Sequence, residues 1–125
     1  MNKYEKLLSE YPDLDVSEEE MKHEGLYCDG SIWIRKDLPS LRKACILAEE
    51  IGHHETSSGV IVDTSDTGNA KQEYVARKWA YKKLVPLEDI YLAFSCGYGK
   101  PYEMAEFLQV DEAFLYECLK SYGFI

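Results

Sequence analysis

Hydrophobic and polar positions along this chain predict a set of helices with one small sheet near the N-terminus. Residues 2–10 predict a short first helix. Residues 25–35 are β-prone on both sides of Asp29-Gly30, a dipeptide that accepts the positive φ values of a tight turn. We therefore expect two or three short antiparallel strands in this region, and we expect the acidic residues 18–20 to lie on a solvated face.

The longest apolar run predicts a central helix from about residue 39 to residue 54. Asp37 is a plausible cap for this helix, and Pro39 suits its first turn. The helix is apolar nearly all round, which is typical of a buried helix. The stretch 55–69 is rich in Ser, Thr, Gly and Asp, so it predicts a loop, with a short strand expected at residues 60–62.

The rest of the chain predicts four more helices. Residues 70–85 form a helix that Pro86 stops, because a residue that precedes proline avoids helical geometry. The next helix starts at Pro86 and ends at residues 97–99. Two shorter helices follow, at 101–108 and 112–122, and in outline they form a helix-turn-helix, a unit that often enters DNA grooves.

The last of these helices is too acidic for a DNA-reading role. It carries Glu112 and Glu117, and Lys120 is its only basic residue, so it lacks attraction for phosphates. We therefore expect the two helices to form a cap that packs through apolar side chains. These are Phe107, Leu108, Phe114, Leu115 and Leu119.

Composition narrows the class of protein. The chain has 125 residues, of which 46% are hydrophobic and 13% aromatic, enough for one core, so we expect a mainly helical α+β domain over residues 1–125. Its parts would be an N-terminal helix and hairpin (1–36), a central helix pair (37–86) and C-terminal helices (87–125).

The formal net charge of −9 argues against a protein that wraps nucleic acid and suits a basic or polar partner. No apolar run approaches the ~20 residues of a membrane span, and no signal peptide opens the chain, so we expect a soluble, cytoplasmic protein.

The central helix carries the run EEIGHH at residues 49–54. In the zinc motif H-E-x-x-H, two His residues hold the ion and the Glu between them activates a water molecule; here Glu49 occupies the position of the first His. Helical geometry places Glu49 and His53 about 40° apart, with Glu50 on the same rim. Two ligands and a base can therefore share one side of the helix. The plainer alternative is that these polar residues simply emerge into solvent where the helix ends.

A second acidic position, Glu73, lies on the following helix. It falls along the same stripe as Ala76 and Ala80, which predicts that its carboxylate faces inward. The small Ala residues would let this helix approach the central helix closely, as a third ligand from a neighbouring helix requires. The alternative is a surface ion pair between Glu73 and Arg77, four residues further on.

Four segments occur in an informative order: GLYCDGSIWI at 25–34, LAEEIGHH at 47–54, QEYVARKWA at 72–80 and LVP at 84–86. Together they resemble the ImmA/IrrE family of metallopeptidases, and the resemblance covers about residues 20–90. It implies a zincin-like core, in which a small antiparallel sheet packs on the motif helix, with a C-terminal helical cap. Members of that family are encoded in phages and mobile elements, where they cleave a partner repressor, or they serve in stress responses.

The resemblance also implies roles for individual residues. Glu50 corresponds to the catalytic base, His53 to the second His ligand and Glu73 to the downstream acidic ligand. Glu49 replaces the first His, and its carboxylate oxygens are still accepted ligands of Zn²⁺. His54 is a candidate accessory residue that orients Glu50 or stabilises the oxyanion, although an ordinary exposed His fits this position equally well.

The replacement at Glu49 changes the electrostatics of the expected site. Two carboxylates and one neutral His cancel the charge of Zn²⁺, so the ion would activate water less, or the site would favour the harder Mn²⁺. We expect a zinc-dependent endopeptidase that acts on one protein partner, a helix-turn-helix repressor encoded nearby, without direct contact to nucleic acid. The alternative is a catalytically weak or silent metal-binding regulator of such a partner. A DNA-binding module built on the C-terminal helices fits the acidic charge least.

Overall fold

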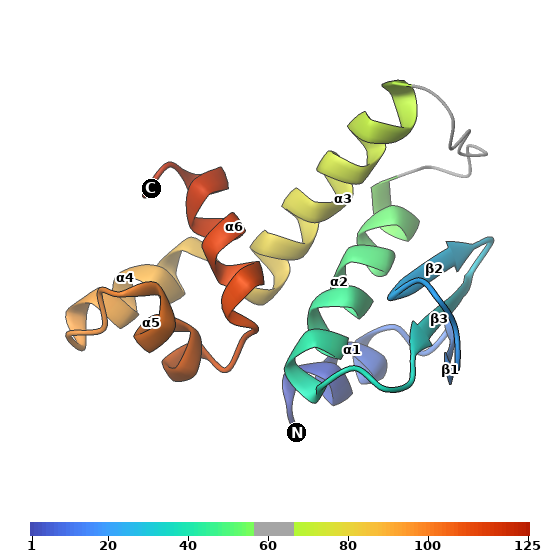
Figure 1. The fold of residues 1–125 in the computed structure, drawn as a ribbon, viewed down its shortest axis with the longest axis horizontal. Helices are drawn as coiled ribbons and strands as arrows, with labels where there is room; N and C mark the ends of the chain where they lie inside the picture. Colours follow the sequence, from blue (N-terminus) through green and yellow to red (C-terminus); the bar gives the residue numbers. More distant parts are fainter. Residues whose placement is uncertain (57–66) are drawn as a thin grey trace.

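The computed structural model describes residues 1–56 and 67–125, so the strand expected at 60–62 lies outside the described residues. Figure 1 shows the order of the elements. They are α1 (Lys3–Glu10), β1 (Asp15–Glu19), β2 (Gly25–Cys28), β3 (Ser31–Arg35), α2 (Ser40–Thr56), α3 (Thr67–Leu84), α4 (Leu87–Ser95), α5 (Pro101–Leu108) and α6 (Glu112–Tyr122). The fold is therefore mainly helical α+β, as the pattern of apolar positions predicts.

The three strands form one mixed sheet in the order β1-β3-β2. β2 and β3 pair as the expected antiparallel hairpin, and their turn uses positive φ angles of 46° at Asp29 and 86° at Gly30. β1, however, runs parallel to β3, so the prediction of a purely antiparallel sheet is wrong. The sequence does not predict β1 as a strand, because an edge strand pairs through its backbone and can leave acidic side chains at the surface.

The acidic residues 18–20 are exposed as expected, and two of them, Glu18 and Glu19, belong to this edge strand. Glu18 is in β1, and its carboxylate accepts hydrogen bonds from Lys43 of α2 at 2.6 Å and from the Tyr4 hydroxyl of α1 at 3.0 Å. A residue that looks like a surface charge in the sequence thus ties the sheet to two helices. Because the Lys43 ammonium donates to it, the pKa of Glu18 lies below its usual value.

Helix α2 is the centre of the molecule, with the sheet on one side and α3 on the other (Figure 1). The inward residues of β3, Ile32 and Ile34, are fully buried and belong to the same core as α2. On the other side, a Cβ atom added at Gly52 would lie 2.5 Å from the carbonyl oxygen of Ala76. The backbones of α2 and α3 therefore approach closely at Gly52, and the expectation that small residues would permit this approach is confirmed.

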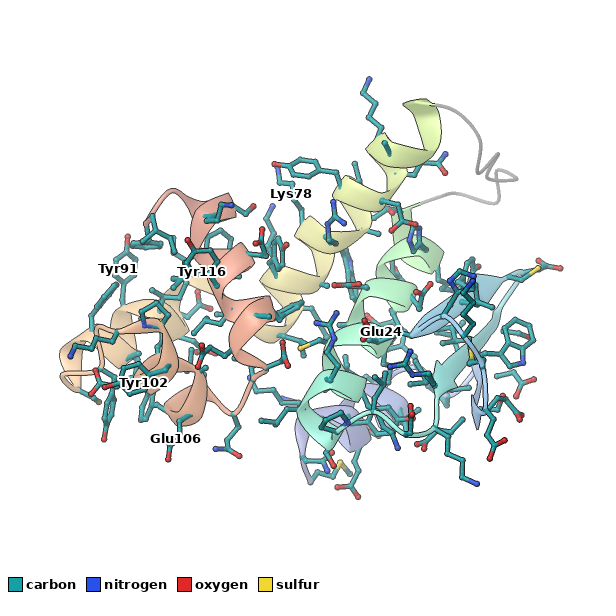
Figure 2. All side chains as sticks on the ribbon, in the orientation of Figure 1. Glu24, Lys78, Tyr91, Tyr102, Glu106 and Tyr116 are labelled. Atoms are coloured by element: carbon teal, nitrogen blue, oxygen red, sulfur yellow. The ribbon has the colours of Figure 1, made fainter. Side chains whose placement is uncertain are left out.

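Helices α4, α5 and α6 form the C-terminal cap. The bounds of α5 and α6 are those that the sequence predicts, and Phe114, Leu115 and Leu119 are buried as expected. Phe107 is an exception, because it is 38% exposed and stacks on Tyr98, with 4.9 Å between the ring centroids. Figure 2 shows that other aromatic side chains, including Tyr91, also project from the outside of this cap. Within the described part of the chain, no helix is long and apolar enough to cross a membrane.

Candidate metal centre

Three polar side chains come from the last turns of α2, where the helix leaves the hydrophobic core. His53 is only 8% exposed, whereas Glu49 and Glu50 are partly buried. Glu50 lies against β2, since a Cβ atom added at Gly25 would come within 3.0 Å of its Oε2 atom. Gly25 therefore leaves the space that the Glu50 carboxylate occupies. In the sequence this glycine looks like an ordinary strand residue.

Helix α3 contributes the fourth polar side chain. The Nε2 atom of His53 lies 3.1 Å from Oε1 of Glu73, and this contact joins the two central helices. The hydrogen bond between them raises the pKa of His53 and lowers the pKa of Glu73. Glu73 thus faces the motif helix as its stripe predicts, although its side chain remains 47% exposed. The alternative surface pair between Glu73 and Arg77 is absent from the ion pairs of the described residues, and Arg77 acts on Glu73 only at longer range.

The pKa of Glu50 is raised to about 7, mainly by burial; the charge of His53 opposes this shift, and the charges of Glu73 and Glu49 add to it. A carboxylate with a pKa near the working pH can accept a proton from water and release it again, which is the requirement for general acid–base catalysis. The raised pKa of Glu50 therefore suits this side chain to exchange a proton with water near neutral pH.

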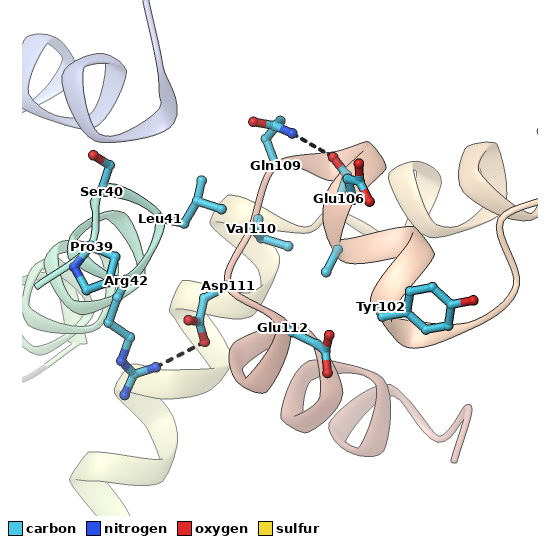
Figure 3. Close-up of a pocket in the computed structure, with 11 residues that line it drawn as sticks. Pro39, Ser40, Leu41, Arg42, Tyr102, Glu106, Gln109, Val110, Asp111 and Glu112 are labelled. Atoms are coloured by element: carbon cyan, nitrogen blue, oxygen red, sulfur yellow. Dashed lines mark hydrogen bonds and ion pairs between the residues drawn. The ribbon is translucent and has the colours of Figure 1, made fainter.

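Two arginines act on Glu49; the sequence pointed to Arg77 only as a possible partner of Glu73, and it did not point to Arg42. Burial raises the pKa of Glu49, while the positive charges of Arg42 and Arg77 lower it. Arg42 is itself fixed by two acidic partners, with Nε 2.8 Å from Oε2 of Glu24 and Nη1 3.5 Å from Oδ2 of Asp111. Figure 3 shows this link between α2 and the start of α6. Arg42 lies two turns before Glu49 on the same helix, whereas Arg77 comes from α3, so the packing of α3 on α2 adds the second positive charge.

A family model described as the IrrE N-terminal-like domain of a peptidase family matches residues 9–120. The chain belongs to this family. No curated protein and no solved structure matches the chain. Membership confirms the resemblance that the four sequence segments carry, and it places the chain among metallopeptidase-like domains.

The IrrE-like family implies a metal ion, and the donor set of this chain is chemically suitable for one. Imidazole and carboxylate groups are accepted zinc ligands, and two ligand atoms on one zinc ion lie ~3.3 Å apart, close to the 3.1 Å between His53 Nε2 and Glu73 Oε1. Within residues 1–56 and 67–125, no three His, Cys, Asp or Glu side chains gather as a complete set of ligands. A complete set would need at least one further ligand beside the His53–Glu73 pair.

His54 lies on the side of α2 that faces β2. It is exposed, and its Nδ1 atom is 2.8 Å from the Tyr27 hydroxyl, with the two rings edge to face. In this IrrE-like domain an accessory role for His54 would therefore involve Tyr27, another residue that the sequence did not single out.

Proposed function

We propose that the protein is a zinc-dependent endopeptidase that hydrolyses a peptide bond in a specific protein partner. The observation that carries this proposal is the 3.1 Å contact between His53 and Glu73, which unites the motif helix with the helix expected to supply the downstream ligand. It occurs in a chain that belongs to a metallopeptidase-like family. In the proposed centre Glu49, His53 and Glu73 hold the ion, for which Mn²⁺ is the alternative, and Glu50 is the base.

The chain's own residues support a hydrolytic mechanism. A bound zinc ion would supply Lewis-acid chemistry, which polarises a carbonyl group and acidifies water. Glu50 accepts the proton of the attacking water and then donates it to the nitrogen of the leaving amine, a transfer that its pKa of about 7 favours. β2 lies at an edge of the described sheet and contacts Glu50 at Gly25, so an extended substrate could pair with this strand and present its peptide bond to Glu50.

A regulator without turnover is the second candidate function, and the surroundings of Glu49 favour it. Arg42 and Arg77 both stabilise the charged form of Glu49, as an ion would, and they reduce the need for a metal at this carboxylate. A centre with two carboxylate ligands also polarises water less than one with two histidines. Such a protein would bind its partner without cleaving it.

For either function, we propose that the partner is a helix-turn-helix repressor encoded nearby and that the two proteins meet in the cytoplasm. The formal net charge of −9 suits a partner with a basic DNA-binding surface, and it disfavours direct contact of this chain with nucleic acid. Binding to the repressor alone would interfere with its access to DNA, and cleavage would make the release irreversible.

The test is to incubate the neighbouring repressor with the wild type and with Glu50→Gln, each loaded with zinc. Loss of the base typically lowers such a rate ~10²–10⁴-fold, so cleavage by the wild type alone supports the endopeptidase. Equal binding by both proteins, with the repressor intact, supports the regulator. Equal cleavage by both proteins would remove Glu50 from the mechanism, and an absence of both binding and cleavage would contradict the choice of partner.

A further inference from the structure

A pocket of about 460 Å³ lies between α3 and α6. Tyr81 lies within it, is 5% exposed and packs edge to face on Phe114 of α6 at 5.1 Å. Tyr74 is 50% exposed. The complete lining is Tyr74, Arg77 and Tyr81 from α3, and Glu117, Lys120 and Ser121 from α6. A space of this size holds one or two side chains of a peptide, with aromatic walls and a few polar groups.

The charge of this pocket is opposite to that of the molecule. Arg77 and Lys120 face a single acidic residue, Glu117, in a chain whose formal net charge is −9. Glu117 does not neutralise Lys120 effectively, because their closest N and O atoms are 4.0 Å apart and both side chains are more than half exposed. Lys78 adds a third cation near the rim, where its Nζ atom lies 5.4 Å from the centre of the Tyr74 ring, and Figure 2 shows it on α3.

Arg77 links this pocket to the candidate centre along α3, because it lines the pocket and lies one helical turn after Glu73. This guanidinium lines the pocket and also acts electrostatically on Glu49 and Glu73. Tyr81 lies one helical turn further along α3, and the charges of Arg77 and Glu49 both act on the pKa of its hydroxyl. A polypeptide that extends from the candidate centre past Glu73 can therefore place one of its side chains between α3 and α6.

We propose that the pocket between α3 and α6 binds an acidic side chain, Asp or Glu, in the segment of the protein partner that approaches the candidate centre. The arginine fork of Arg77 matches a carboxylate in geometry, and Lys120 supplies a second charge-assisted hydrogen bond. Tyr74 and Tyr81 cover the apolar stem of the bound side chain. This inference rests on the proposed function, because that function makes the bound molecule a polypeptide. It adds to that function a pocket that helps to select the partner.

The test is a selection of displayed random dodecapeptides on the zinc-loaded full-length protein. On the wild type, Asp and Glu should be enriched about tenfold at one position relative to Asn and Gln, as expected for one charge-assisted contact. The enrichment should disappear on Lys120→Glu and decrease on Lys120→Gln, which removes the cation without adding a charge beside Glu117. Lys82→Glu is the matched control, because Lys82 is an exposed residue of α3 outside the pocket and gives the same change in net charge. Thermal melts should verify that each variant is folded.

An absence of acidic preference on the wild type, or the same preference on all the variants, would overturn the proposal. A dimer of the wild type that dissociates in Lys120→Glu would assign the pocket to a second copy of the chain and would also overturn it. The selected peptides are then incubated with the wild type and with Glu50→Gln. Acidic preference without cleavage would support the acidic-side-chain pocket and argue against the endopeptidase. Cleavage without acidic preference would support the endopeptidase and overturn the pocket proposal.

Discussion

The α2–α3 pair and the α5–α6 pair differ in what holds their helices together. At α2–α3, the close approach at Gly52 is followed by charged groups, with His53 against Glu73 and with Glu49 and Glu50 nearby. The α5–α6 pair packs through side chains that are at most 3% exposed, such as Met104, Ala105, Phe114 and Leu115. The first pair thus carries electrostatic repulsion inside a tight helix contact, while the second has apolar packing alone. A bound cation would relieve this repulsion, so the stability of the first pair should depend on a ligand more than that of the second.

Metal removal should have the largest effect and should be concentrated in α2 and α3. A cation relieves the repulsion among Glu49, Glu50 and Glu73, and zinc at 100 times its Kd would stabilise the fold by about 2.7 kcal/mol, which corresponds to a shift in Tm of about 10 °C. A chelator should lower the Tm, and added Zn²⁺ or Mn²⁺ should restore it. Hydrogen exchange should show loss of protection in α2 and α3 before α5 and α6.

The control for this prediction is Glu73→Gln, which keeps the shape of the side chain and removes the charge that pairs with His53. Its Tm should respond weakly to zinc. If the wild type shows no change in Tm with a chelator or with either ion, the metal assignment is wrong.

Gly52→Ala should have the next largest effect, because the new Cβ would lie 2.5 Å from the Ala76 carbonyl oxygen, a backbone atom that cannot turn away. The two helices must then separate, at a cost of about 1–3 kcal/mol in the free energy of unfolding. Gly99→Ala is the control, since its Cβ would only make ordinary contact with Phe94 at 3.8 Å. Urea unfolding measures both. Equal stability of the two variants would show that the α2–α3 contact is looser than its geometry indicates.

The same contrast explains what the sequence could predict. The limits of α5 and α6 follow from signals within a few residues: Pro101 in the first turn, an Asp111 side chain that accepts from the Phe114 amide at 3.0 Å, and Gly123 with a φ of 87° after the last turn. Such signals are visible in a single sequence. The pairing of Glu73 with His53 was also predictable, because the stripe of Ala76 and Ala80 gives the orientation of α3.

Features that join distant segments were not predictable in this way. β1 pairs with β3 in a parallel register that places Asp15 opposite Ser31, and the acidic sequence of β1 does not indicate this pairing. Gly25 matters only because α2 brings Glu50 against it, and the ion-pair partners of Arg42, Glu24 and Asp111, come from other segments of the chain. These arrangements depend on how whole elements pack, so local periodicity cannot reveal them.

Asp111→Ala should weaken the cap moderately. The substitution removes the side-chain acceptor at the start of α6, which is typically worth ~1 kcal/mol, together with the 3.5 Å ion pair to Arg42. Asp111→Asn is the matched variant, because it keeps a capping oxygen and loses only the charge. In urea unfolding, the free energy of unfolding of Asp111→Asn should therefore lie between those of the wild type and Asp111→Ala. If Asn is as unstable as Ala, the link to Arg42, and not the helix cap, is the main contribution of Asp111.

The smallest expected effect concerns pH and the Glu24–Arg42 pair beside the candidate centre. The hydrogen bond from Arg42 holds the pKa of Glu24 below its ordinary value of 4.5. A carboxyl group whose pKa is lowered in the folded state stabilises the fold above its unfolded pKa, and this contribution is lost as the pH falls through the lowered folded value. Because the pair is partly exposed, the contribution should be less than about 1 kcal/mol. Urea unfolding should therefore show that, between pH 5 and pH 3, the free energy of unfolding falls more in the wild type than in Glu24→Gln. If the free energies of the two proteins change in parallel with pH, solvent already screens the pair.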